Sequence, residues 1–134
     1  VVIDAGSAIT VDWVDPGGTF CGGAIMPGLE LQSRSLVMGT EALPQIELTI
    51  GAGFELPAKN TSDAIRAGIV LGAASALGGL IDRYTAASGL SSQQMQVVLT
   101  GGDARTLGPH VRTSHQIITN LVCQGLLRLE GGLS

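Results

Sequence analysis

Apolar residues come in three short runs at the start of the chain, and each run ends at a turn signal. The first run is VVID at 1–4, the second is AITVDWVD at 8–15, and the third occupies 19–28 and ends in Pro-Gly. The stretch DPGG at 15–18 separates the second run from the third and is a strong turn signal. The pattern predicts three strands joined by short turns, which is an antiparallel meander.

The apolar spacing then changes to that of helices. Over 29–39 it predicts a helix that ends at a glycine, and the longest helix is predicted from Thr61 to about Ala87. The segment between them, 40–59, holds prolines and glycines and predicts an irregular connection.

The long predicted helix is unusually rich in small residues, which predicts that another backbone packs very close to it. The small residues are Gly68, Gly72, Ala73, Ala76, Gly78 and Gly79. Its uncharged stretch, 67–81, is bounded by Arg66 and Asp82 and is shorter than the roughly 18 residues that span a bilayer. A buried helix is therefore expected, and no membrane partner.

The rest of the chain alternates strand and helix. Residues 94–100 predict a fourth strand, GGDA turns it into a helix, 115–119 predict a fifth strand, and 120–129 predict a last helix. The expected order is β-β-β-α-α-β-α-β-α, an α/β arrangement.

Composition excludes some functions and constrains the cysteines. The chain has 134 residues, 45% hydrophobic and 13% charged, which is enough for one domain with a core. Its net charge is −4 and Lys59 is its only lysine, so binding to nucleic acid through phosphate neutralisation is not expected. Cys21 and Cys123 are far apart in sequence and are predicted to be buried thiols in a cytosolic protein.

The turn between the first two predicted strands, Asp4 to Ser7, is the first candidate site. Gly6 lets backbone N–H groups approach a phosphate, and the Ser7 hydroxyl can donate to a phosphate oxygen. Asp4 would repel phosphates unless a cation lay between them, so it would have to be a cation ligand. The alternative is a hairpin whose Asp and Ser cap their own backbone, and spacing alone favours this alternative.

Two further candidates lie at helix starts. Gly101 and Gly102 follow the fourth predicted strand, and ligands of open α/β sheets bind outside the carboxyl ends of strands. An ordinary turn with Asp103 as the helix N-cap is the simpler explanation of that pair alone. Thr61 follows Asn60 at the start of the long helix, where polar residues are more often caps than ligand contacts.

Taken together, four segments resemble the second half of type III pantothenate kinases. They are DAGSAITVD (4–12), GGAIMPGLELQSRSL (22–36), NTSDAIRAGIVLG (60–72) and VVLTGGDA (97–104). The family belongs to the acetate/sugar kinase, heat-shock chaperone and actin superfamily, whose members pair two RNase H-like domains around an ATP cleft. The resemblance implies that residues 1–134 form one RNase H-like α/β domain, with a mixed five-stranded sheet and flanking helices. It would be the C-terminal half of a two-domain kinase.

The resemblance also implies an activity, the ATP-dependent phosphorylation of pantothenate in the cytoplasm as the first step toward coenzyme A. Asp4 matches the family's ligand for a monovalent cation, potassium or ammonium, and Ser7 matches its ATP contact. Magnesium would accompany ATP.

The remaining site residues also follow from the resemblance. Gly6, Gly101 and Gly102 match glycines on the ATP side, and Thr61 matches the threonine that contacts pantothenate. The small-residue helix fits the tightly packed seam of a homodimer, which the family uses.

Two family motifs do not occur in this chain, the D-x-G-N-T phosphate loop and the G-x-D-R motif with the general base. No catalytic residue is therefore assigned here, and the chain alone is expected to be inactive. One alternative is a non-catalytic, nucleotide-binding or regulatory relative, because the family overlaps with proteins first described as accessory transcription factors. Another kinase of the superfamily is a further alternative, although GGAIMPGLELQ would not be expected there.

Overall fold

The structure, a computed structural model, describes residues 1–48, 53 and 55–131. Within these residues, strands and helices follow the predicted order, with a short 3-10 helix added after α3. The elements are β1 (Val2–Ala5), β2 (Ala8–Val14), β3 (Phe20–Pro27), α1 (Leu29–Gly39), α2 (Thr61–Ser88), β4 (Val98–Thr100), α3 (Ala104–Leu107), η1 (Gly108–His110), β5 (Gln116–Ile117) and α4 (Leu121–Gly131). Part of the connection predicted over 40–59, namely 49–52 and 54, lies outside the described residues.

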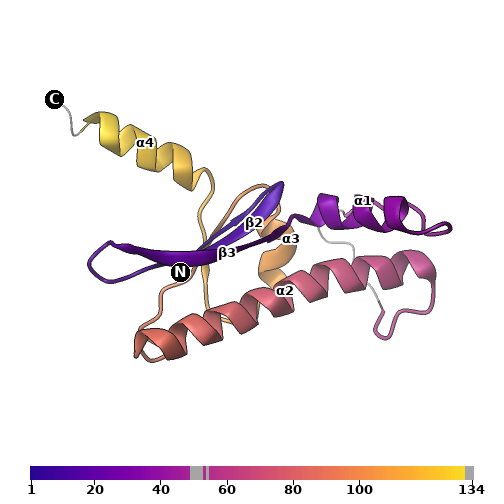
Figure 1. Cartoon of the computed structure of the whole chain (residues 1–134), viewed down its shortest axis with the longest axis horizontal. Helices are drawn as coiled ribbons and strands as arrows, with labels where there is room; N and C mark the ends of the chain where they lie inside the picture. The colour runs from indigo at the N-terminus through magenta and orange to yellow at the C-terminus, as the bar shows by residue number, and fades with distance from the viewer. Residues whose placement is uncertain (49–52, 54, 132–134) are drawn as a thin grey trace.

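The five strands form one mixed sheet in the order β3-β2-β1-β4-β5. The first three strands pair antiparallel as the predicted meander, whereas β4 pairs parallel with β1, and β5 pairs parallel with β4. Figure 1 shows α2 running along one face of this sheet and α4 projecting away from it. The arrangement confirms the predicted RNase H-like α/β fold.

Helix α2 forms the core with the sheet because one of its faces is apolar along its whole length. Its buried side chains recur mostly at helical spacing, and they are Ile65, Ala67, Ile69, Val70, Ala73, Ala74, Leu77 and Ile81. They meet the buried face of the central strands, where Ile3 of β1 lies in register with Val11 and Leu99. Each large side chain buried here stabilises the fold by about 1.5–3 kcal/mol.

The two ends of α2 are fixed by local chemistry. The Asn60 side chain accepts a hydrogen bond from the Asp63 backbone N–H at 2.9 Å, so Asn60 is the N-cap. The helix ends at Gly89, whose φ of 71° is left-handed. Near that end the Tyr84 hydroxyl donates to the Val11 carbonyl oxygen at 3.3 Å, and its ring stacks on Trp13.

By length and composition alone, α2 could cross a membrane. Its apolar face is packed on the sheet, however, and Arg66, Asp82 and Arg83 interrupt its sequence. The prediction of a buried helix thus holds for one face of this segment, whereas Gly68 and Gly72 are exposed.

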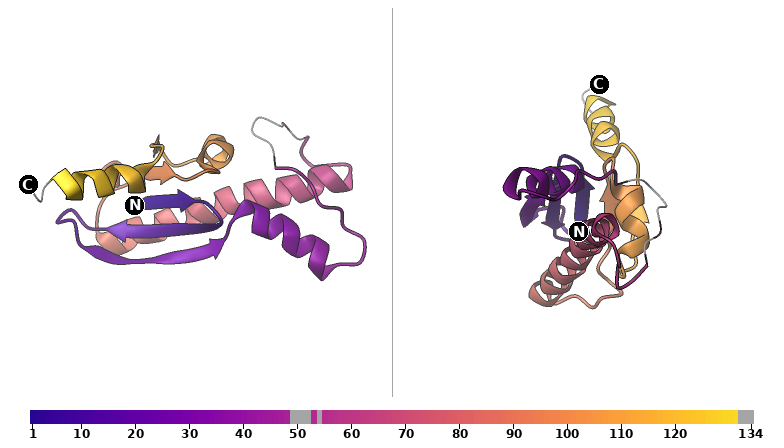
Figure 2. Two further views of the ribbon diagram at one scale, coloured as in Figure 1. Left: turned by 90° about the horizontal axis from the view of Figure 1, so that it is seen from above. Right: turned by 90° about the vertical axis from the view of Figure 1, so that its right-hand side faces the viewer.

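Helix α1 extends past the end of the sheet, and Figure 2 shows it beside the first half of α2. Leu29 anchors α1 in the core, since it is only 1% exposed. The buried Ser33 hydroxyl donates to the Ile46 carbonyl oxygen at 3.3 Å and holds the following segment against the helix. The α1 helix is therefore tied to the core at its N-terminal end and to the 40–48 segment along its side.

Two predictions from the sequence are corrected. Cys21 and Cys123 are both exposed free thiols, because Cys21 lies on the edge strand β3 and Cys123 on the projecting helix α4. The fourth strand is shorter than the predicted 94–100, although Met95 and Val97 ahead of it are buried.

The glycines of α2 bear on the predicted close packing of another backbone. Among the described residues, a Cβ atom built on Gly68, Gly72 or Gly78 would meet nothing within 4 Å, and one on Gly79 would meet only the side chain of Arg83. The close backbone predicted from the small residues is therefore not supplied by the described part of this chain.

Candidate functional site

The carboxyl ends of β1 and β4 meet because the two strands are parallel neighbours. Asp4 of β1 lies in register with Thr100 of β4. The turn at Gly6 and Ser7 follows β1, and the turn at Gly101 and Gly102 follows β4. The structure thus brings together the first two sets of residues that the sequence singles out.

Gly101 packs directly on the end of β1. Its φ is +93°, and a Cβ atom there would lie 2.6 Å from the Ala5 carbonyl carbon and 2.6 Å from Asp4 Oδ1. The Asp103 backbone N–H donates to the Ala5 carbonyl oxygen at 2.9 Å and holds the two turns together. Only glycine combines this backbone conformation with this approach.

The polar groups at this point differ in exposure. The Ser7 side chain is exposed, whereas Asp4 is half-buried between its strand neighbours. The Gly6 backbone N–H is already bonded to the Ala8 carbonyl oxygen at 3.0 Å, which closes the turn. The Ser7 hydroxyl is therefore the group that this turn presents to solvent.

Asp103, which follows the Gly101–Gly102 turn, is a second carboxylate at this end of the sheet. Burial, and secondly the negative charge of Glu30, raise the pKa of the Asp103 carboxyl above its usual value. Asp103 occupies the N-cap position of α3, but its side chain makes no capping hydrogen bond, which corrects the capping role expected of it. Glu30, in the first turn of α1, thus lies close enough to act on the end of β4.

Thr61 stands apart from these turns. It is exposed at the first position of α2, and both views show that helix starting well beyond the end of the sheet (Figures 1 and 2). The cap is Asn60, so Thr61 does not fill the simple structural role that its position suggested. One turn further on, Arg66 pairs with Asp63 at 2.6 Å, and its Nε has no hydrogen-bond partner among the described residues.

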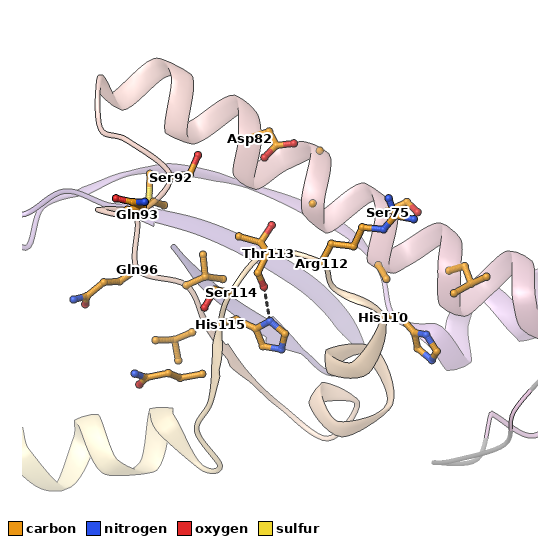
Figure 3. A pocket seen from close by; sticks show the side chains of 18 of the residues that line it. Ser75, Asp82, Ser92, Gln93, Gln96, His110, Arg112, Thr113, Ser114 and His115 are labelled. Carbon is orange, nitrogen blue, oxygen red and sulfur yellow. Dashed lines mark hydrogen bonds between the residues drawn. The ribbon is translucent and has the colours of Figure 1, made fainter.

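A large cavity lies elsewhere. It has a volume of about 1150 Å³ and lies between α2 and the segment 110–116, with Asp82 on one side and Arg112 on the other (Figure 3). In this cavity His115 Nδ1 lies 2.7 Å from the Thr113 carbonyl oxygen. None of the sequence-predicted site residues lines it.

The described residues contain no group of three or more His, Cys, Asp or Glu side chains that could bind a metal ion. Asp4 therefore does not belong to a cluster of three or more such side chains among the described residues.

The strand order and the two joined turns are those of an RNase H-like α/β domain. A family model described as type III pantothenate kinase matches residues 1–83. The chain belongs to this family of coenzyme A biosynthesis kinases.

Individual relatives agree with this assignment. The chain is 42% identical over 129 residues to a type III pantothenate kinase of Alkalilimnicola ehrlichii, covering 96% of this chain and 49% of that protein. It is 37% identical to the one of Rhodopirellula baltica, covering 96% of this chain and 46% of that protein. The chain thus spans about half the length of the curated relatives it matches.

A solved structure from Campylobacter jejuni, described as a Baf family transcriptional activator, superposes with a TM-score of 0.66. It covers 96% of this chain and 55% of that chain at 23% identity, so it supports the fold alone.

Sequence reasoning did not single out Gly28, Glu30 or Arg66. In the sequence, Glu30 and Arg66 resemble ordinary exposed helix residues. Only the structure shows that the charge of Glu30 raises the pKa of Asp103, and that Arg66 Nε has no hydrogen-bond partner among the described residues. The sequence predicts Gly28 only as the end of a strand. A Pro-Gly pair directly before a helix, in a chain whose first turn is also glycine-containing, is the signal that could have found it.

Proposed function

We propose that this chain is the C-terminal half of a type III pantothenate kinase, and that the complete protein transfers the γ-phosphate of ATP to pantothenate. The observation that carries the proposal is the junction of the Asp4–Ser7 turn with Gly101 at the ends of two parallel strands. Ligands bind at this edge of open α/β sheets, and glycine admits a phosphate close to the backbone. Membership of the family supplies the substrate class.

In this proposal the chain binds and orients ATP. The exposed Ser7 hydroxyl donates to a phosphate oxygen, while Gly6, Gly101 and Gly102 let the nucleotide lie against the backbone. Phosphoryl transfer depends mostly on positioning and charge stabilisation, so residues that only bind and orient can contribute much of the rate. No residue of this chain is assigned as the general base.

Asp4 is proposed as the ligand of a monovalent cation, potassium or ammonium, whose charge offsets that of the phosphates. One half-buried carboxylate beside an exposed turn fits such an ion, because the nucleotide itself supplies oxygen ligands. Magnesium is expected to arrive with ATP, held largely by phosphate oxygens.

Thr61 is proposed to contact pantothenate. Its hydroxyl is exposed, and the cap of α2 is Asn60, so the hydroxyl is not needed for the helix. The exposed stripe of small residues on α2, which includes Gly68 and Gly72, is proposed as the seam of a cytoplasmic homodimer.

The full-length protein tests the function. We expect formation of ADP that depends on both pantothenate and potassium, while the purified chain 1–134 gives no turnover above a control without enzyme. Turnover by the chain alone would show that the general base lies within it. Nucleotide binding by the full-length protein without pantothenate-dependent ADP would instead favour the non-catalytic alternative.

The cation is tested by Asp4→Asn in the full-length protein. Loss of the carboxylate should raise the potassium concentration for half-maximal activity by about tenfold, equivalent to about 1.4 kcal/mol. An unchanged half-saturation point would remove Asp4 from the cation site.

A further inference from the structure

The start of α1 lies directly against the turn that follows β1. Pro27, the last residue of β3, pairs with Ala8 of β2, and this register places Gly28 beside Ser7. The Gly28 backbone N–H donates to the Ser7 carbonyl oxygen at 3.1 Å, and Gly28 is buried. Ser7, whose hydroxyl faces solvent, is therefore bonded through its backbone to the N-cap residue of α1.

This contact leaves no room for a side chain at position 28. A Cβ atom there would lie 2.5 Å from the Ser7 carbonyl oxygen and 2.8 Å from the Ser7 carbonyl carbon, and would also collide with the Gly6 carbonyl oxygen. These are backbone atoms, so no rotamer change can relieve the contact. The φ of Gly28 is −64°, which any residue adopts, so the need for glycine here is one of space and not of backbone conformation.

Helix α1 cannot easily move away from the turn. Leu29 is fixed in the core, the Gln32 side-chain amide donates to the Pro27 carbonyl oxygen at 2.9 Å, and Ser33 is bonded to Ile46. Gly28 thus stands on a rigid element, whereas the Gly6–Ser7 turn is a two-residue loop with an exposed side chain. If a side chain were added at position 28, the Gly6–Ser7 turn would therefore move and the start of α1 would not.

We propose that Gly28 is a positioning residue for the nucleotide, and that it sets the place of the Ser7 hydroxyl through their backbone contact; this rests on the proposed function of Ser7. A methyl group at position 28 must push the turn outward until the 2.5 Å contact reaches an ordinary separation, a shift of roughly 1 Å. A misplacement of about 1 Å can cost about a hundredfold in rate.

The test is Gly28→Ala in the full-length kinase, with Gly39→Ala as the matched control. Gly39 ends the same helix, and a Cβ atom there meets nothing within 4 Å among the described residues. We expect Gly28→Ala to raise the KM for ATP, and the Kd of the non-hydrolysable analogue AMP-PNP, about 10- to 100-fold. The KM for pantothenate should change less than twofold, and Gly39→Ala should leave all three constants unchanged.

A loss of stability alone would lower the active fraction and leave both KM values where they are. A folded Gly28→Ala enzyme with an unchanged KM for ATP, or with equal rises in both KM values, would therefore overturn the inference.

Hydrogen exchange of the wild-type protein decides the case if Gly28→Ala does not fold. Opening of the turn frees the Gly28 N–H, so AMP-PNP should slow exchange in a peptide covering 27–32 at least tenfold. A peptide covering 36–40 at the other end of α1 should not respond. Equal exchange with and without AMP-PNP would overturn the inference.

The two proposals fail in different ways. A protein that binds AMP-PNP with protection at 27–32 but does not phosphorylate pantothenate contradicts the proposed function and leaves the role of Gly28 in place. If the protein phosphorylates pantothenate but Gly28→Ala changes neither the KM for ATP nor the Kd of AMP-PNP, only the role of Gly28 is contradicted. A protein that binds no nucleotide contradicts both.

Discussion

Two groups of glycines occupy this chain, and they serve different purposes. Gly28 and Gly101 pack against the backbone at either side of the β1–β2 turn, where a Cβ atom would collide with main-chain atoms. Gly68 and Gly72 of α2 face open space in the described structure. The number of glycines in a segment therefore says little about close packing, because the partner backbone comes from elsewhere in the fold or from another molecule.

The largest effect is expected at Gly101. Gly101→Ala combines a positive φ with contacts of 2.6 Å to Asp4 and Ala5, so the free energy of unfolding should fall by roughly 3–5 kcal/mol. Chemical denaturation of the full-length protein measures this change. Gly102→Ala is the control for stability, because a Cβ atom there meets nothing within 4 Å and should cost less than about 1 kcal/mol. Equal losses at both positions would contradict the difference between packed and open glycines.

Thr61→Ala should act on binding and not on folding. Loss of a hydrogen bond to pantothenate, worth about 1.5–3 kcal/mol, raises the KM for pantothenate roughly 10- to 100-fold. The KM for ATP should barely move, because Ser7 and the turn glycines are the residues proposed to bind that ligand.

The melting temperature should hardly change either, since Asn60 caps the helix. Asn60→Ala is the stability control and should cost about 1 kcal/mol. An unaltered pantothenate constant in Thr61→Ala would remove Thr61 from the substrate site.

Gly72→Ala tests whether the glycines of α2 are packed by a partner subunit. If the proposed seam lies there, an added methyl group weakens the homodimer by about 1–1.4 kcal/mol, a five- to tenfold rise in its dissociation constant. Sedimentation equilibrium measures that constant. Gly125→Ala on α4 is the control, because its Cβ also meets nothing within 4 Å among the described residues. An unchanged dimer constant with a gain of about 0.5–1 kcal/mol in stability would show that these glycines merely face solvent.

The smallest effect is expected at Glu30, whose negative charge acts on Asp103 near the packed glycine Gly101. A raised pKa means that the folded protein prefers protonated Asp103, so the penalty acts at neutral pH and is relieved as the pH falls through that pKa. Glu30→Gln removes the smaller cause of the shift. Because Asp103 is only partly buried, solvent screens this repulsion, and its removal should contribute no more than about 0.3 kcal/mol of stability at pH 7. Thermal melts at pH 7 and at about pH 4 should show the gain shrinking in acid, whereas a gain independent of pH would exclude this origin.

Much of the fold could be predicted because its signals are local. Apolar runs broken by DPGG and Pro-Gly give the meander, and an apolar stripe with Asn60 ahead of it gives α2. The exposure of Cys21 and Cys123 could not be predicted in this way. It depends on which strand becomes the edge of the sheet and on how α4 is placed, and both are properties of the assembled fold.

Some residues of the candidate site could likewise be predicted from the sequence, and others could not. Asp4, Ser7 and Gly101 could be picked out from motif resemblance, and the parallel pairing of β1 with β4 accounts for their meeting. The contact of Gly28 with Ser7 joins residues that no periodicity connects, since it depends on the register of β2 and β3. The field of Glu30 on Asp103 likewise arises only when α1 is placed beside the end of β4.

The sheet order also has a consequence for synthesis on the ribosome. β1 lies in the middle of the finished sheet, yet its parallel partner β4 is encoded about 100 residues later. At a synthesis rate of roughly 5–20 residues per second, β4 emerges on the order of 5–20 s after β1. During this interval the future central strand is an edge strand, with unpaired N–H and C=O groups that another chain can engage. The nascent protein is thus most open to mispairing while α2 is being made.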